Sequence, residues 1–117
     1  MQRFMLKSKI HRATLTGTEL DYEGSIAIDR DLIAAADLLP GEQVHVLNLN
    51  NGERLVTYVI PAPAGSGTML LNGPAARLGV RGDKVVILAY TVVAADEART
   101  LRPTVIYVDE NNRQTAK

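Results

Sequence analysis

Hydrophobic residues along the chain fall mostly into short runs with the alternation that is typical of β-strands. In residues 43–49, Val44 and Val46 alternate with polar positions, and residues 54–60 form a second such run. The asparagines and the glycine of residues 50–52 tolerate the left-handed backbone of a tight turn. The pattern therefore predicts a β-hairpin over residues 43–60.

The other predicted strands are residues 5–16, 68–71, 84–93 and 104–108. The run at 84–93 is apolar enough to be buried on both faces. In the first strand, side chains should alternate between the two faces of the sheet. A strict period of two would then put four residues on one face: Lys9, His11, Ala13 and Leu15.

Helical patterns are scarce. Asp29 can cap a short helix over residues 31–36, which Pro40 and Gly41 close. A second helical turn, over residues 74–78, starts with proline, where a helix tolerates it. Many short strands and one or two short helices predict a mainly β fold, a small barrel or sandwich. We expect residues 1–117 to form a single domain, with a loose polar end at 111–117.

Composition narrows the classes of function. The 117 residues include 13 basic and 13 acidic side chains, and this balance argues against nucleic acid as the main ligand. The absence of cysteine excludes disulfides and thiolate chemistry, and the two separated histidines have no metal-ligand spacing, so we expect no metal. With no signal peptide and no apolar run of about 20 residues, the expected location is the cytoplasm.

The segment DYEGSIAID, residues 21–29, contains a Gly24–Ser25 pair that can rearrange its own backbone. On its own, such a pair indicates only a flexible turn between a strand and a helix. Glycine, however, accepts strained backbone angles and leaves its carbonyl open to attack. Attack by the Ser25 hydroxyl would give an ester, and elimination and hydrolysis would then leave a pyruvoyl group at residue 25 and release ammonia. This reaction would split a zymogen into chains 1–24 and 25–117.

Five short motifs around this pair occur in an order and spacing that one enzyme family shares. They are KIHR (9–12), YEGS (22–25), NGER (51–54), TY (57–58) and NG (72–73). On these motifs the chain resembles the pyruvoyl-dependent aspartate 1-decarboxylases, lyases that make β-alanine for pantothenate biosynthesis. The resemblance extends over nearly the whole chain, from MLKSKIHR at residues 5–12 to DEARTLRP at residues 96–103.

The resemblance implies a double-psi β-barrel that cleaves itself autocatalytically between Gly24 and Ser25. It implies that the pyruvoyl group made from Ser25 is the cofactor, and that it forms a Schiff base with the amino group of L-aspartate before CO2 leaves. It also implies a homotetramer with active sites between subunits. Whether maturation needs a helper protein stays open.

Individual site residues also follow from the resemblance. Arg54 would hold a substrate carboxylate, Tyr58 would protonate the carbanion, and Thr57 would contact substrate and assist cleavage. The substrate loop would be Asn72, Gly73, Pro74 and Ala75. Without the resemblance, the simpler interpretations are an exposed arginine at a strand end, a packed strand tyrosine and a plain turn.

Two questions about this site stay open at the level of sequence. Neighbouring strand residues face opposite ways, so a shared pocket for Thr57 and Tyr58 needs a bend, a bulge or two different subunits. Lys9 and His11 could form a positive pocket for a dicarboxylate, or belong to a solvated basic edge strand. Tyr22 could position groups near the cleavage site or simply pack beside it.

The sequence departs from the family pattern at two positions. Pro74 stands where alanine is frequent, and proline has no N–H to offer a substrate, so Ala75 would take over. Ile26 replaces a small residue after the reacting pair. The reacting hydroxyl and carbonyl belong to residues 25 and 24, so we expect Ile26 to be tolerated.

Two rival functions stay open beside decarboxylation of L-aspartate. One is the same pyruvoyl chemistry on another acidic amino acid, because a sequence does not measure the length of a pocket. The other is a non-catalytic β-barrel that binds a ligand and never cleaves. Only the enzyme requires a chain break at residue 25.

Overall fold

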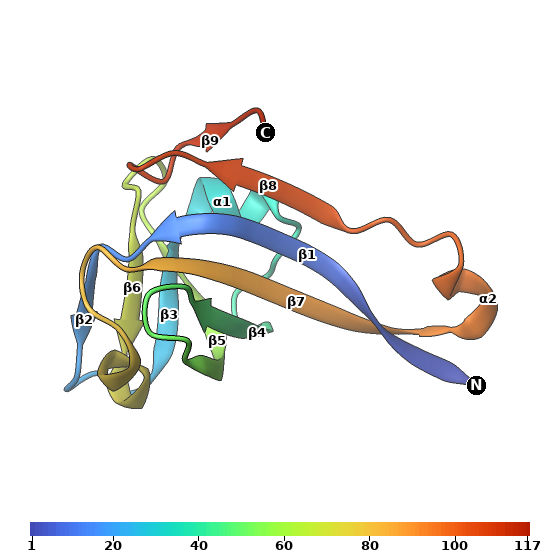
Figure 1. Cartoon of the computed structure of the whole chain (residues 1–117), viewed down its shortest axis with the longest axis horizontal. Helices are drawn as coiled ribbons and strands as arrows, with labels where there is room; N and C mark the ends of the chain where they lie inside the picture. The colour runs from blue at the N-terminus through green and yellow to red at the C-terminus, as the bar shows by residue number, and fades with distance from the viewer.

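The computed structural model describes residues 1–117, and it is mainly β (Figure 1). The strands are β1 (Gln2–Thr14), β2 (Gly17–Glu19), β3 (Ser25–Asp29), β4 (Gln43–Asn48), β5 (Arg54–Ala62), β6 (Met69–Asn72), β7 (Lys84–Ala94), β8 (Thr104–Val108) and β9 (Gln114–Thr115). The helices are α1 (Arg30–Ala35), the 3-10 helix η1 (Gly73–Leu78) and α2 (Ala95–Ala98). The predicted mainly β class with few short helices is confirmed, and the structure is consistent with a small β-barrel.

One nine-stranded sheet connects the strands in the order β2-β6-β3-β5-β4-β7-β1-β8-β9. β4 and β5 pair as the predicted antiparallel hairpin, and β3 runs parallel to β5 and antiparallel to β6. A cluster of 19 buried hydrophobic residues lies inside the curved sheet, with Ile10, Ile26 and Val59 fully inaccessible to solvent. The fold thus holds β3 firmly between two neighbours.

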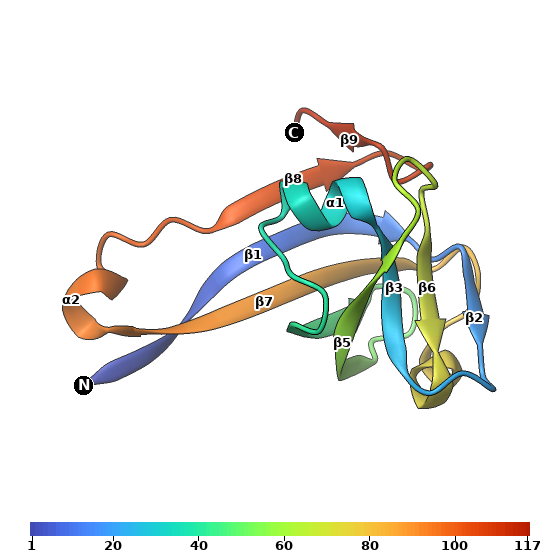
Figure 2. The same ribbon diagram turned by 180° about the vertical axis from the view of Figure 1, so that it is seen from behind.

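A two-stranded arm extends beyond this body. The first residues of β1 pair with the last residues of β7, from Gln2 opposite Ala94 to Leu6 opposite Tyr90. Both views show β1 and β7 running together away from the other strands towards α2 (Figures 1 and 2). Several of its side chains, Phe4 and Val92 among them, are exposed and apolar. The arm therefore offers apolar surface that this chain leaves uncovered.

The expected face of the first strand is wrong beyond His11. Arg12 adopts a φ of 63°, and the pairing of β1 with β7 shifts between Ile10 and Ala13. This irregularity inserts an extra residue into the alternation. As a result Ala13 and Leu15 are buried in the same core as Ile10, and they do not share the face of Lys9 and His11.

Other expectations need correction at the level of elements. β1 pairs with β7 on one side and with β8 on the other, so Lys9 and His11 do not lie on an edge strand. The second half of β7 is not buried, since Tyr90 and Val92 are exposed. The end of the chain is not loose throughout, because β9 pairs with β8 and Asn112 is buried.

Four elements were not predicted: β2, β3, α2 and β9. The most consequential is β3, because it starts at Ser25 and all five of its residues are buried. The predicted helix after Asp29 is present as α1, and the Asp29 carboxylate accepts a hydrogen bond from the Asp31 N–H at 2.8 Å. The predicted turn after residue 73 is present as η1.

Candidate active site

Ser25 is the first residue of β3 and has an unusual backbone. Its φ is 110°, and that of Gly24 before it is 139°. Glycine reaches such angles easily, whereas for serine a conformation of this kind costs about 1–3 kcal/mol and persists only where the surroundings hold it. Ser25 is only 1% exposed. The strand therefore buries a strained residue at the bond that the sequence singles out.

Asn72 fixes the Ser25 hydroxyl. The two residues face each other in the pairing of β3 with β6, and Asn72 Nδ2 donates a hydrogen bond to Ser25 Oγ at 3.0 Å. Both side chains are buried, so little water competes for this bond. The contact stabilises negative charge on the oxygen, which would make the hydroxyl a better nucleophile.

A hollow of about 410 Å³ opens beside this pair. It is lined by residues 23–25, residues 55–58 at the start of β5, Asn72, and three residues of η1, namely Pro74, Ala75 and Leu78. Its volume falls within the roughly 300–1,000 Å³ typical of ligand sites. Among these residues only Glu23 carries a charge, so the hollow contributed by one chain is negative.

Thr57 and Tyr58 both line the hollow, although they are neighbours on a strand. The pairing of β3 with β5 begins only at Ile26 opposite Val59. Residues 55–58 therefore have no strand beside them on that side, and the hollow lies along the free edge of β5. Side chains on both faces of β5 can reach it, so no bend and no second subunit is needed to bring Thr57 and Tyr58 together.

Gly73 packs against the backbone of residues 22–24, the segment that leads to Ser25. Its φ is 62°, and a Cβ at this position would lie 2.7 Å from both the Gly24 nitrogen and the Tyr22 oxygen. Only glycine allows this approach. Pro74 and Ala75 follow at the start of η1 and face the hollow, whereas Gly73 does not line it.

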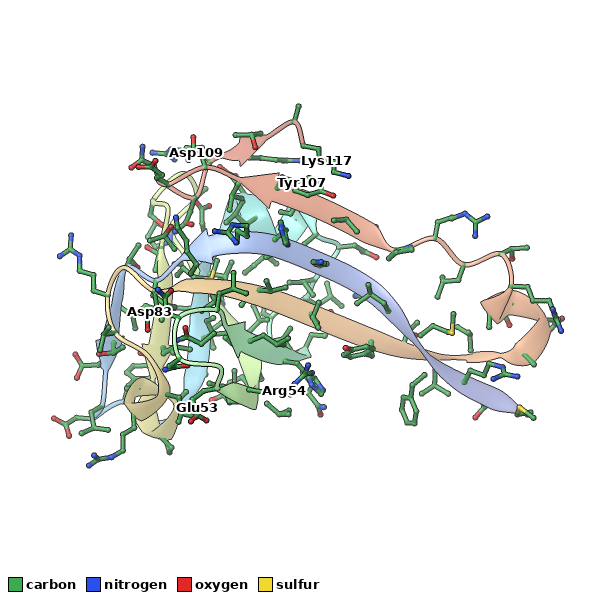
Figure 3. The ribbon with its side chains drawn as sticks, in the orientation of Figure 1. Glu53, Arg54, Asp83, Tyr107, Asp109 and Lys117 are labelled. Carbon is green, nitrogen blue, oxygen red and sulfur yellow. The ribbon has the colours of Figure 1, made fainter.

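Besides Gly73, four predicted site residues do not line the hollow: Lys9, His11, Tyr22 and Arg54. Arg54 is exposed at the start of β5, at the same end of the molecule as η1 (Figure 3). Lys9 and His11 lie on β1, which β5, β4 and β7 separate from β3 in the sheet. Tyr22 is exposed, and its backbone oxygen lies close to Gly73.

His11 belongs to a basic region on another side of the molecule from Arg54. Its ring packs edge-on against Tyr107 at 5.7 Å between ring centroids, and Figure 3 places Tyr107 and Lys117 together there. Burial lowers the pKa of His11, and the charges of Lys9, Arg12 and Lys117 lower it further. Both effects disfavour the protonated form of the His11 ring.

Asp29, at the far end of β3, has a role that the sequence did not indicate. Besides capping α1, its carboxylate accepts hydrogen bonds from the Gly65 and Gly67 N–H groups, at 3.1 and 2.8 Å. Burial would raise the pKa of Asp29. The pKa is nevertheless held below its ordinary value, because the carboxylate accepts hydrogen bonds from the N–H groups of Gly67, Asp31 and Gly65 and lies near the charge of Arg113. Asp29 thereby connects the end of β3 to the loop before β6. In the sequence, the two glycines of GSG at residues 65–67 were the only indication of this contact.

Three further residues of the hollow, Leu55, Val56 and Leu78, were also not predicted, because apolar residues carry no chemical signal in a sequence. No cluster of three or more histidine, cysteine, aspartate or glutamate side chains is placed to hold a metal ion. None of the helices has the length and apolar character needed to cross a bilayer.

Comparison with known proteins agrees with the motifs. The family model described as aspartate decarboxylase matches residues 1–115. An aspartate 1-decarboxylase of Dehalococcoides mccartyi is 60% identical over 111 residues, which cover 95% of this chain and 90% of the relative. That of Moorella thermoacetica is 56% identical over 116 residues, which cover 99% of this chain and 91% of the relative. That of Thermoanaerobacter pseudethanolicus is 54% identical over 113 residues, which cover 97% of each.

The fold, the site and these matches place the chain among the carboxy-lyases, the enzymes that remove a carboxyl group as CO2. Within that class, the chain belongs to the aspartate decarboxylase family.

Proposed function

We propose that this chain cleaves itself between Gly24 and Ser25 and then decarboxylates L-aspartate to β-alanine, as a cytoplasmic enzyme of pantothenate biosynthesis. The observation that carries the proposal is the buried, strained Ser25, whose hydroxyl is held by Asn72 beside an open hollow. The family and its relatives, named aspartate 1-decarboxylases, support the substrate.

The self-cleavage would follow from the geometry of the Gly24–Ser25 bond. Ser25 Oγ attacks the Gly24 carbonyl carbon, and the hydroxyl proton passes to the Ser25 nitrogen. The bond from that carbon to the nitrogen breaks, which leaves an ester and a free amine. Loss of the Ser25 α-proton expels the Gly24 carboxylate and leaves dehydroalanine at residue 25. Water then replaces the nitrogen, which leaves as ammonia, and a pyruvoyl group remains. Relief of the strained backbone favours the first step.

The surroundings of residue 25 fit a pyruvoyl group. Ser25 Oγ would leave with the Gly24 carboxylate, so the pyruvoyl oxygen would stand where the Ser25 nitrogen was. The Asn72 amide, which donates to Ser25 Oγ at 3.0 Å in the intact chain, would lie beside this small group. When present, the group withdraws electrons from the substrate so that CO2 can leave. Tyr58 would supply the proton from the free edge of β5. Ala75 is the first residue after Pro74 that has an N–H to offer a carboxylate.

The charge of the hollow supports an active site shared between subunits. L-Aspartate carries two carboxylates, yet the only charged side chain that one chain places in the hollow is that of Glu23. We propose that Lys9 and Arg54 of a neighbouring copy, in a homotetramer, provide the missing positive charge. The apolar arm supports assembly, since Phe4 is 81% exposed and lies, with Tyr90 and Val92, in a second hollow of about 520 Å³.

The proposal is tested by CO2 release from L-aspartate and from L-glutamate. The purified chain should release CO2 from L-aspartate, and the Ser25→Ala variant should release none. One additional methylene changes discrimination by about 10–200-fold, and L-glutamate should be the poorer substrate by such a factor. Faster CO2 release from L-glutamate would show that L-glutamate, and not L-aspartate, is the preferred substrate.

Tyr58 is tested separately. The variant Tyr58→Phe removes the proposed proton donor and should lower kcat about 10²–10⁴-fold with little change in KM. Tyr107→Phe, which removes a hydroxyl on another side of the molecule, is the matched control. Equal activity of the two variants would remove Tyr58 from the mechanism.

A further inference from the structure

Gly73 corresponds to a substrate-loop residue, yet in the intact chain it faces the backbone of residues 22–24 rather than the hollow. The contact is as close as backbone atoms allow. A Cβ on Gly73 would lie 2.7 Å from the Gly24 nitrogen and 2.8 Å from the Gly24 Cα. Gly73 itself is buried. No side chain can be added there without moving the segment that leads to the reacting bond.

The same turn also holds the nucleophile. Asn72, directly before Gly73, donates to the Ser25 hydroxyl at 3.0 Å and pairs with Ser25 across the sheet. Two adjacent residues therefore restrain the two sides of the Gly24–Ser25 bond. Asn72 restrains the hydroxyl after the bond, and Gly73 restrains the backbone before it.

The direction in which a Cβ of Gly24 would point is open. A Cβ added to Gly24 would have nothing within 4 Å, although its φ of 139° requires glycine. Open space surrounds Gly24 where its own Cβ would point, so nothing on that side keeps the residue in place. The close contact to Gly24 comes from Gly73, which approaches its nitrogen and its Cα.

We propose that Gly73 is a positioning residue for self-cleavage. Because Gly73 has no Cβ, the Asn72–Gly73 turn packs closely against residues 22–24 and holds the Gly24 carbonyl where the Ser25 hydroxyl can attack it. This inference rests on the self-cleavage proposed above. While the chain is intact, its own segment covers Gly73, and only cleavage frees that segment to move and uncover the substrate loop.

The test compares Gly73→Ala with Gly82→Ala. Gly82 also has a positive φ, of 94°, but a Cβ there meets nothing within 4 Å, so this variant carries the backbone strain without the collision. Cleavage is followed by intact-protein mass at a temperature where circular dichroism shows both variants folded. We expect Gly82→Ala to cleave with the half-time of the unmodified chain and Gly73→Ala to cleave at least tenfold more slowly. Half-times within twofold of each other would overturn the proposal.

Two further measurements keep the outcomes distinct. If Gly73→Ala does not fold, one glycine inserted between Asp21 and Tyr22 gives the exposed segment slack to leave Gly73, and it should also slow cleavage at least tenfold. Wild-type cleavage in this folded variant would contradict the positioning role. If the unmodified chain and Gly82→Ala both stay intact, the proposed self-cleavage fails, which is a different result from a loss confined to Gly73.

Discussion

At the scale of single residues, the site is built from a few polar groups in unusual surroundings. Ser25 combines a positive φ with a buried hydroxyl that a single amide donor holds. Glu23, two residues earlier, places a carboxylate in the same hollow. A carboxylate beside an acidic substrate is unfavourable, because two like charges at about 6 Å repel each other by roughly 0.7–3 kcal/mol, depending on the local dielectric.

Glu23 is therefore predicted to weaken substrate binding. In the Glu23→Gln variant we expect the KM for L-aspartate to fall about fivefold, equivalent to about 1 kcal/mol, with kcat per cleaved chain unchanged. The effect should shrink as ionic strength rises, because salt screens exposed charges. Asp21→Asn, which removes a carboxylate of the same exposed turn outside the hollow, is the control. A higher KM in Glu23→Gln would show that Glu23 binds substrate instead.

At the scale of elements, β3 connects the Gly24–Ser25 bond to the core. Its first residue is Ser25 and its last is Asp29, which bonds to the start of α1 and to the loop at Gly65 and Gly67. The strand is thus fixed at both ends and paired on both sides. A strained residue at its start cannot relax by sliding the strand.

Loss of the Asp29 carboxylate should be costly. The Asp29→Ala variant leaves three backbone N–H groups without their acceptor, and we expect the free energy of unfolding to fall by about 2–4 kcal/mol. Urea denaturation in the Ser25→Ala background, where the chain stays intact, measures this. Asp31→Ala, an exposed acidic residue of the same helical turn, should cost less than about 1 kcal/mol. Equal losses would mean that negative charge near the start of α1, rather than these three hydrogen bonds, explains the role of Asp29.

The same carboxylate predicts a dependence on pH. The pKa of Asp29 is lowered in the folded state, so its contribution is present above the ordinary value of about 3.9 and is lost as pH falls through the lower folded pKa. The stability difference between the intact chain and Asp29→Ala should be constant from pH 7 to about pH 5 and shrink below about pH 4. A difference that grows towards low pH would contradict this assignment.

At the scale of the whole molecule, the exposed arm of β1 and β7 is the part that a single chain does not explain. Its length contributes to the 42 Å long axis of the molecule, against 29 and 25 Å for the others. Phe4 and Val92 cover no core of this chain. A surface of this kind is typical of an interface between subunits.

Replacing Phe4 should therefore affect assembly rather than folding. In Phe4→Ser we expect a smaller particle by light scattering after size exclusion, and lower activity per chain, because the sites lose the charges of the neighbouring copy. Unfolding of the separated chain should change by no more than about 0.5 kcal/mol. Leu39→Ser, at another exposed apolar position off the arm, should leave the mass unchanged. An unchanged particle mass for Phe4→Ser would exclude the arm from the interface.

Much of this molecule could be predicted from the sequence, because local signals were strong. The hairpin of β4 and β5 followed from alternation and a turn containing glycine, α1 from the Asp29 cap, and β8 matched its predicted range. The family motifs named Ser25, Thr57, Tyr58 and Asn72, which the fold brings together around one hollow.

The remainder depends on contacts between distant segments. β3 was not predicted because a Gly-Ser pair resembles a turn, whereas its strand pairing comes from residues 59–62 and 69–72. The irregularity at Arg12 arises between the neighbours β7 and β8, and nothing in KIHR indicates a positive φ. Periodicity also could not place Thr57 beside Tyr58, because the free edge of β5 exists only where β3 stops pairing.

The central claim, that Ser25 cuts the chain and becomes a pyruvoyl group, is tested most directly by the intact mass of the purified protein. We predict two fragments, residues 1–24 and residues 25–117, the larger lighter by one ammonia than a chain starting with serine. The Ser25→Ala variant should give one intact mass. A single uncleaved mass for the unmodified chain after long warm incubation, in a folded sample that still releases CO2 from L-aspartate, would contradict the account.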